Sequence, residues 1–316
     1  MNVLHISQTP LVAAPQKISS ALNTYTDVHS NCLVVKDYEG SKANIFSDQS
    51  LIFHENDYIY DVIEKSDVIH IHNDIEKKIS AILKEVAKEK VYIYQTHSYL
   101  REGPLYYDRS EYLPFDFKKK LVIAQYQPRV YPEFTMVPNL ILHDASYHEN
   151  WNNPVKILYS PAQRNTYGRW GTKYSSKLEK VLIDMENNDN VQIITASGVH
   201  PNELYRLRKT ADITIDEIFT GGFHQISLEG LCAGNAVINA ADFFSLEIAR
   251  AVADRNETPP FVFASESNIE EVLLDLINNR HKLNSVKKQS YDFFVHNLDP
   301  KKLINKYVDI YKSATS

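Results

Sequence analysis

The strongest constraint on the fold is an alternation of short apolar segments with amphipathic helical segments, which runs through the chain twice. The first run begins with a strand pattern at Asn2–Ser7 and ends at Thr135–Val137, and the second begins at Val155–Tyr159. Alternating strands and helices favour a parallel sheet with helices on both faces. We therefore predict an α/β protein made of two doubly wound, Rossmann-like domains.

A polar segment without periodicity, HDASYHENWNNP at residues 143–154, separates the two runs as a linker would. We place an N-terminal domain at 1–148 and a C-terminal domain at 149–298. A final amphipathic helix, within 299–316, is expected to pack back on the N-terminal domain. The length of 316 residues suits two domains of about 150 residues each.

Charge and cysteine content exclude several classes of protein. A net charge of −6 argues against a nucleic-acid partner, whose phosphates would need Lys and Arg. The two cysteines, Cys32 and Cys232, stand in apolar runs, which predicts buried free thiols and no metal site built from them. The N-terminus has no signal-peptide pattern, and no run of about 18 apolar residues occurs, so we expect a cytoplasmic protein. Lys118–Lys120, after Phe117, hint at peripheral contact with anionic lipid at the inner face of the membrane.

Polar side chains gather where strands of the first run end, which is where doubly wound sheets bind ligands. The strand DVIHIH places His70 and His72 on one face, and Asp74 follows. Two histidines and an aspartate can bind a metal, but further ligands are not apparent, and substrate contacts or a hydrogen-bonded core pair are the alternatives. His97 follows the next strand and is a site candidate by the same rule.

A basic loop follows the first strand of the second run. Arg164 lies in the loop 160–172, and Lys173 follows it. Guanidinium groups fit phosphate oxygens, so this loop predicts an anion clamp, although exposed loop cations are common.

The stretch from Thr220 to Ala240, TGGFHQISLEGLCAGNAVINA, reads as a loop, a helix and a strand. A helix N-terminus preceded by glycines offers backbone N–H groups and a positive dipole end to a phosphate. No GxGxxG occurs in the first loop of the chain, which lowers the expectation of an NAD or FAD enzyme.

These segments together resemble GT-B glycosyltransferases, most closely the retaining family-4 type. LHISQTPLVAAPQKISSALN resembles the first strand, loop and helix of that family, and DVIHIHND and VPNLI resemble two further segments of its first domain. ILYSPAQRNTYGRWGTK resembles its basic loop, and TGGFHQISLEGLCAGNAVI resembles its EGFG…LEAMACGxPVI signature. The resemblance implies the GT-B fold, in which two doubly wound domains face an interdomain cleft.

The resemblance also assigns roles to residues. Glu229 would hold the nucleotide ribose, and Arg164 and Lys173 would bind the diphosphate. The turn before the helix would add backbone contacts, so that the donor-binding set is Arg164, Lys173, Gly222, Phe223, Gln225 and Glu229. His97 would lie against the donor sugar.

Two positions depart from the family pattern. Gly221 stands where the first glutamate of the signature is expected, and Trp170 stands where the basic loop would carry its lysine. Glu217, its neighbour Asp216, or His224 could supply the missing donor-sugar contact. The catalytic candidates are therefore His97, Glu217 and His224.

We expect a glycosyltransferase that moves a sugar from a nucleotide-sugar donor to a glycan, lipid-linked or protein acceptor in bacterial-type cell-surface glycan assembly. The resemblance implies a retaining, metal-independent reaction without a cofactor. Two alternatives stay open: a catalytically silent GT-B partner subunit, which the missing glutamate favours, and a nucleotide-sugar 2-epimerase.

Overall fold

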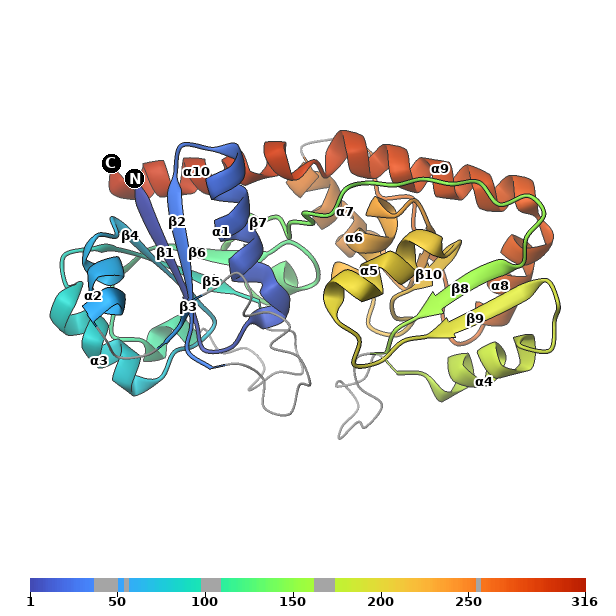
Figure 1. Cartoon of the computed structure of the whole chain (residues 1–316), viewed down its shortest axis with the longest axis horizontal. Helices are drawn as coiled ribbons and strands as arrows, with labels where there is room; N and C mark the ends of the chain where they lie inside the picture. Colours follow the sequence, from blue (N-terminus) through green and yellow to red (C-terminus); the bar gives the residue numbers. More distant parts are fainter. Residues whose placement is uncertain (37–50, 54–56, 98–108, 162–173, 254–256) are drawn as a thin grey trace. The chain divides into compact units, whose positions relative to one another are not determined.

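The computed structural model describes residues 1–36, 51–53, 57–97, 109–161, 174–253 and 257–316 (Figure 1). The chain forms two compact units. Unit 1 contains Met1–Leu142 together with Pro300–Ser316, and unit 2 contains His143–Asp299. Each unit is built on its own parallel sheet, which confirms the predicted α/β class with two doubly wound domains.

Unit 1 has a seven-stranded sheet in the order β3-β2-β1-β4-β5-β6-β7, with every pairing parallel. Its strands are β1 (Asn2–Ser7), β2 (His29–Val34), β3 (Leu51–Ile52), β4 (Val68–His72), β5 (Val91–Thr96), β6 (Phe117–Ile123) and β7 (Thr135–Val137). Its helices are α1 (Ala14–Tyr25), α2 (Asp57–Glu64), α3 (Lys77–Val86) and α10 (Pro300–Thr315), with 3-10 turns at Leu11–Ala13, Arg109–Tyr112 and Gln127–Arg129.

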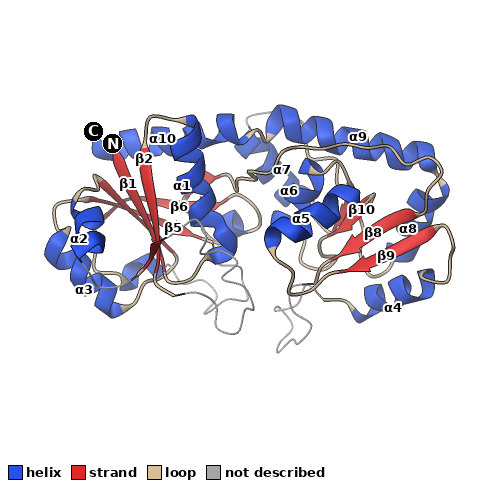
Figure 2. Ribbon diagram, viewed as in Figure 1, coloured by secondary structure: helices blue, strands red, loops and turns tan. Residues whose placement is uncertain are grey.

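The two faces of this sheet differ in chemistry. One face is an aliphatic core, in which Leu4 and Ile71 pack with Ile63 of α2 and Leu83 of α3. Side chains alternate along a strand, so the intervening residues face α1 and α10 on the other side of the sheet (Figure 2). That second face is partly polar, because His5 of β1 is among the residues that it carries.

The C-terminal helix α10 is fixed to unit 1 by buried tyrosines. The Tyr307 hydroxyl donates to the Pro138 carbonyl at 3.0 Å, and the Tyr311 hydroxyl lies 2.9 Å from His70 Nδ1. Both side chains are fully buried, and α10 packs along α1 (Figure 1). A segment distant in sequence thus completes the polar face of the first sheet.

Unit 2 has a five-stranded parallel sheet in the order β12-β11-β10-β8-β9. Its strands are β8 (Val155–Tyr159), β9 (Val191–Thr195), β10 (Ile213–Ile215), β11 (Ala236–Asn239) and β12 (Val262–Phe263). Its helices are α4 (Ser176–Met185), α5 (Pro201–Thr210), α6 (Gln225–Cys232), α7 (Phe243–Ala253), α8 (Ile269–Asn278) and α9 (Arg280–Asn297).

Apolar packing and a buried ion pair between Lys287 and Asp212 help to hold unit 2 together. Aliphatic side chains of β8, β10 and β11 pack with α4 and α8 in one cluster, while α5 and α6 contact β8, β10 and β11. Lys287 Nζ of α9 lies 2.5 Å from Asp212 Oδ1, and both side chains are at most 1% exposed. Asp212 also accepts from Asn150 Nδ2 at 2.7 Å, so this carboxylate links α9 to the segment before β8.

Several sequence expectations are corrected in detail. Helix α3 ends at Val86, because Ala87 leaves helical geometry at φ −130°. The edge strand β3, only two residues long, was not predicted. Lys118–Lys120, for which lipid contact was predicted, belong to β6, between β5 and β7. Cys32 and Cys232 are buried and free, as predicted. No helix among the described residues is long and apolar enough to cross a membrane.

Candidate functional site

The turn after β10 is organised by two buried carboxylates. Asp216 Oδ2 accepts from the His224 N–H at 2.7 Å and from Ser227 Oγ at 2.8 Å, and Asp216 Oδ1 lies 3.3 Å from His224 Nδ1. Glu217 Oε2 accepts from the Thr220 N–H at 2.8 Å, and its Oε1 accepts from Thr220 Oγ1 at 2.5 Å. Both carboxylates therefore fix the loop that leads into α6, and the catalytic role of Glu217 stays a prediction.

Gly221 is required by the backbone of this loop. Its φ of +78° lies in the left-handed region, and a Cβ at this position would stand 2.9 Å from Asp242 Oδ2. Its carbonyl accepts from the Asp242 N–H at 3.0 Å and from Ser245 Oγ at 2.7 Å. A side chain at this position would therefore strain the backbone and press against the Asp242 carboxylate.

The N-terminus of α6 presents backbone donors. The N–H groups of Ser227 and Leu228 bond to the His224 carbonyl, whereas those of Gln225 and Ile226 have no acceptor among the described residues. The His224 N–H is already taken by Asp216, so of the predicted turn donors it is not available to a ligand. Phe223 buries its ring against Phe261, and Gly222 is buried beside it with its N–H donating to Thr220 Oγ1 at 3.3 Å. The predicted contacts of both residues with a donor stay predictions.

Glu229 lies one turn into α6 and is part of a buried ion pair. Its Oε2 accepts from Arg208 Nη1 at 2.8 Å, and its Oε1 accepts from Gln225 Nε2 at 2.5 Å. Arg208, in α5, is fully buried, and Glu229 is 6% exposed. This pair holds the carboxylate beside the first turn of α6. The predicted ribose contact of Glu229 stays a prediction.

The basic loop and the glycine turn leave neighbouring strands. β8 pairs directly with β10 through Ile157–Ile213 and Tyr159–Ile215, so both connections start at the same edge of the sheet. Arg164 and Lys173 themselves lie outside the described residues. In unit 2 the structure thus brings together Glu217, Gly222, Phe223, His224, Gln225 and Glu229 on one turn and helix.

His97 belongs to unit 1, where it ends a chain of histidines. His5 Nδ1 lies 2.8 Å from His72 Nε2, and His72 Nδ1 lies 2.8 Å from His97 Nε2. The parallel pairing of β1 with β4 sets His5 opposite His70, whose Nδ1 lies 2.9 Å from the Tyr311 hydroxyl. Asn73 Oδ1 accepts the His97 N–H at 2.6 Å and so holds the main chain at that point.

These histidines are neutral at physiological pH. Burial lowers the pKa of His97 to about 3. Burial, and then the nearby His97, lower the pKa of His5 to about 3. Burial also places the pKa values of His70 and His72 well below the ordinary value, and the neighbouring imidazoles add to both shifts. A neutral imidazole carries one N–H and one acceptor nitrogen, so each ring can donate one bond and accept one.

A metal is the other chemistry that this cluster suggests. His5, His70 and His72 each offer a ring nitrogen, and the three atoms lie within 4.8 Å of one another. Three imidazoles can bind zinc. Both nitrogens of His72, however, are engaged by His5 and His97, so a metal at this point would have to break one of those bonds. The contacts in the structure fit a hydrogen-bonded chain better than a metal centre.

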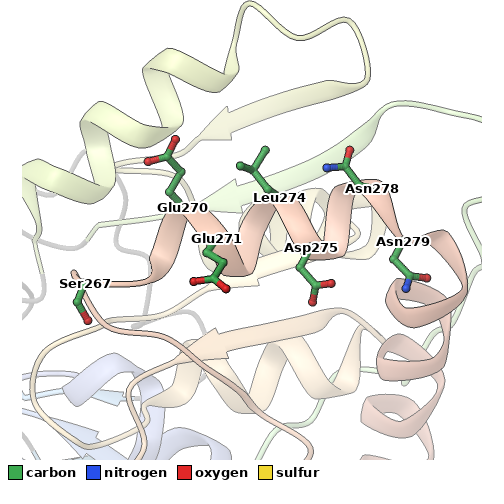
Figure 3. Close-up of a pocket in the computed structure, with 7 residues that line it drawn as sticks. All are labelled: Ser267, Glu270, Glu271, Leu274, Asp275, Asn278 and Asn279. Atoms are coloured by element: carbon green, nitrogen blue, oxygen red, sulfur yellow. The ribbon is translucent and has the colours of Figure 1, made fainter.

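A surface pocket lies along α8 (Figure 3), and none of the turn residues described above lines it. Three of the side chains that line it are carboxylates: Glu270, Glu271 and Asp275. Their negative charges would repel a nucleotide diphosphate, which is also negatively charged. We therefore do not assign the donor to this pocket.

Sequence reasoning missed His5, Arg208 and the close approach of Asp242. If two strands are expected to pair, the residues that lie opposite each other can be predicted. The pairing of β1 with β4 could have indicated that His5 lies beside His70. Arg208 lies in helix α5 (Pro201–Thr210). Its burial depends on how α5 packs on α6, and the sequence of α5 alone does not reveal that.

No protein-family model matches the sequence, and a comparison with curated proteins finds no match. Solved structures do match. A glycosyltransferase from Rickettsia africae ESF-5 superposes with a TM-score of 0.59 at 12% identity, over 99% of this chain and 98% of its own. WaaG, a glycosyltransferase involved in lipopolysaccharide biosynthesis, superposes with a TM-score of 0.53 at 14% identity, over 98% of this chain and 99% of its own.

A UDP-GlcNAc 2-epimerase from Neisseria meningitidis bound to UDP-GlcNAc superposes with a TM-score of 0.51 at 14% identity, over 99% of both chains. Identities this low speak for the fold and not for the substrate. Two parallel α/β units, matched over nearly the whole chain by glycosyltransferases, give this protein the GT-B fold.

Proposed function

We propose that the protein is a glycosyltransferase that takes a sugar from a nucleotide-sugar donor bound by unit 2. The observation that carries this proposal is the start of α6. There the N–H groups of Gln225 and Ile226 have no acceptor among the described residues, at the ligand-binding edge of a parallel sheet. A diphosphate is the group that such a helix start and an adjacent basic loop would bind together.

The chemistry follows from charge. As the bond between sugar and diphosphate breaks, negative charge grows on the leaving phosphate oxygens. The α6 amides, with Arg164 and Lys173 from the loop after β8, would stabilise that charge without a metal. Glu229, held by Arg208, would accept a hydrogen bond from a ribose hydroxyl. His224, beside Asp216, and Glu217 are the candidates for contact with the donor sugar.

Unit 1 would bind the acceptor, and His97 would touch the donor sugar or the acceptor hydroxyl. We infer that the acceptor belongs to cell-surface glycan assembly. The similarity to WaaG, a glycosyltransferase involved in lipopolysaccharide biosynthesis, supports this inference. A retaining, metal-independent reaction in the cytoplasm, with only peripheral membrane contact, completes the proposal. Retention predicts that the anomeric configuration of the donor persists in the product, and metal independence predicts full activity in EDTA.

Two other functions have specific support. The similarity to a 2-epimerase favours an enzyme that alters the donor itself, and such an enzyme would form product without any acceptor. The glycine at 221, where a side chain would be strained and crowded by Asp242, favours a silent binding subunit. A silent subunit would bind a nucleotide but neither hydrolyse nor transfer the sugar.

The first experiment is a thermal-shift screen of nucleoside diphosphates and monophosphates, because ligands that bind only the folded state raise its melting temperature. The best diphosphate is then titrated against wild type, Arg164→Ala and the control Arg206→Ala, whose side chain is 78% exposed on α5. A lost charge-assisted contact of about 1.5–3 kcal/mol should weaken binding roughly 10- to 100-fold in Arg164→Ala alone. Equal affinity in all three proteins would remove the clamp from the proposal.

The second experiment separates the three functions. Purified protein is incubated with the matching nucleotide sugar, with and without a mixture of glycan and lipid-linked acceptors. Acceptor-dependent release of the nucleotide supports the transferase. An isomerised donor without acceptor supports the epimerase, and binding without turnover supports the silent subunit.

A further inference from the structure

The histidine chain of unit 1 has a direction. His5, His72 and His97 are joined end to end by two contacts of 2.8 Å between ring nitrogens. His5 and His72 are fully buried, and the chain ends at His97, which follows the carboxyl end of β5. Each neutral ring supplies one N–H, so both hydrogen bonds must point the same way along the chain.

The buried end of the chain decides between the two directions. His5 Nε2 has no hydrogen-bond partner among the described residues. If the bonds pointed toward His5, this nitrogen would carry a hydrogen with no acceptor, and such orphaned N–H groups are rare in protein interiors. If they point toward His97, His5 holds its hydrogen on Nδ1 and donates it to His72, and only a bare ring nitrogen is left unpaired.

We propose that His5 and His72 fix His97 in the tautomer that carries its hydrogen on Nδ1. His72 donates from Nδ1 to His97 Nε2, which leaves the other nitrogen of His97 as an N–H donor at the end of β5. His97 then donates a hydrogen bond to an oxygen of a bound substrate and does not act as a base. His5 and His72 are positioning residues, and the assignment of the substrate rests on the proposed function.

The surroundings of His97 support a fixed donor. The Asn73 side chain accepts the His97 backbone N–H at 2.6 Å, and Gln127 Nε2 donates to the His97 carbonyl at 3.3 Å. Asn73 itself has a φ of +58°, a left-handed conformation that asparagine tolerates better than most residues. Ring and main chain are therefore held from different sides, which is the preorganisation that an oriented donor needs.

The test of the tautomer needs no activity. The full-length protein is labelled with 15N-histidine, and long-range 1H–15N correlation spectra show which nitrogen of each of the 12 histidines carries hydrogen. His97→Gln identifies the His97 signals by their loss. We expect hydrogen on Nδ1 of His97 and of His72 at pH 7.5. Hydrogen on His97 Nε2, a mixture of both tautomers, or a stoichiometric metal ion in protein purified without chelator would overturn the proposal.

A pair of variants tests the role of His72. In His72→Asn the amide N–H stands the same number of bonds from the backbone as Nδ1 and can still donate to His97, whereas His72→Leu cannot. We expect the His97 tautomer to persist in His72→Asn and to become mixed in His72→Leu. In the transferase assay, kcat should be about tenfold lower in His72→Leu than in wild type and close to the wild-type value in His72→Asn. The pH profile of kcat should show no new ionisation between pH 6 and 8 in either variant.

The tautomer spectra and the transferase assay test different statements. If the expected tautomer is found but the protein transfers no sugar, the proposed function is wrong and the histidine chain stands. If sugar is transferred while His97 carries its hydrogen on Nε2, the inference about the chain is wrong and the function stands. Equal kcat in His72→Leu and wild type would show that the tautomer has no part in the reaction.

Discussion

The buried histidines should make unit 1 sensitive to mild acid. His5, His70 and His72 are fully buried, and burial lowers the pKa of each below its ordinary value. In the unfolded chain the same side chains would take up protons near pH 6.5. Above pH 6.5 such a group is neutral in both states, so proton uptake does not favour unfolding. Below pH 6.5 only the unfolded chain gains protons, so the free energy of unfolding falls.

The size of the effect follows from the number of histidines. Each proton that only the unfolded state binds costs about 1.4 kcal/mol of stability per pH unit. These three histidines alone should therefore cost about 4 kcal/mol between pH 7.5 and pH 5.5, and His97, whose pKa burial lowers to about 3, should add to the loss. That is a large part of the roughly 5–15 kcal/mol that stabilises a typical domain, and it should lower the melting temperature by about 8–16 °C.

Urea unfolding at several pH values measures this loss. The comparison is between wild type and His70→Phe, which keeps a ring among His5, His72 and Tyr311 but cannot bind a proton. The variant will differ from wild type at pH 7.5, because it lacks the bond to Tyr311, so the informative quantity is the change with pH. That change should be smaller by about 1.4 kcal/mol in the variant. Identical pH dependence in the two proteins would refute the reasoning.

Three further predictions concern unit 2 and are measured by urea or thermal unfolding. Glu229→Gln should cost about 3 kcal/mol, because it leaves the Arg208 guanidinium buried without its carboxylate, and adding Arg208→Met should recover most of the loss; additive effects would argue against the pair. Gly221→Ala should cost about 2–3 kcal/mol against roughly 1 kcal/mol for Gly198→Ala, since both have positive φ but only Gly221 has a close neighbour; equal costs would contradict this. Lys287→Met should cost about 3–5 kcal/mol, because it leaves the Asp212 carboxylate buried without its cation; an unchanged free energy of unfolding would show that the pair is dispensable.

The last of these variants should also change the response to acid. Although burial raises the pKa of Asp212, hydrogen bonds from His148 and Lys287 hold it below the ordinary value. Stability from this carboxylate is present above its unfolded pKa of about 4 and is lost as the pH falls toward the folded value. Without Lys287 the folded pKa rises, so acid unfolding should begin at a higher pH.

Much of the fold was predictable from local pattern. The strands at Asn2–Ser7 and Val155–Tyr159 are found at the predicted residues, because short apolar segments are recognisable from consecutive residues. The limits of α3 and the start of β6 were not predicted, because helix ends depend on capping and on neighbouring strands. The turn before α6 was recognised from Gly221 and Gly222, whose place before a helical pattern is a local signal.

The contacts that give the candidate site its chemistry are different in kind. Nothing in the sequence near His97 shows that His72 and His5 stand behind it in a chain. The departure at Gly221 was visible in the sequence, but its cause, the approach of Asp242, was not.

By itself, then, the sequence determined two α/β units, the strand ends at which polar residues gather, and the turn before α6, because each depends on short-range periodicity and backbone preference. Only the tertiary structure decided which charged groups pair with each other and in which direction the hydrogen bonds of the histidine chain point. The pairing of Arg208 with Glu229 depends on how α5 packs beside α6, and the order of the histidines depends on the register of β1 against β4. Such contacts form between residues far apart in the chain, and burial then sets their strength.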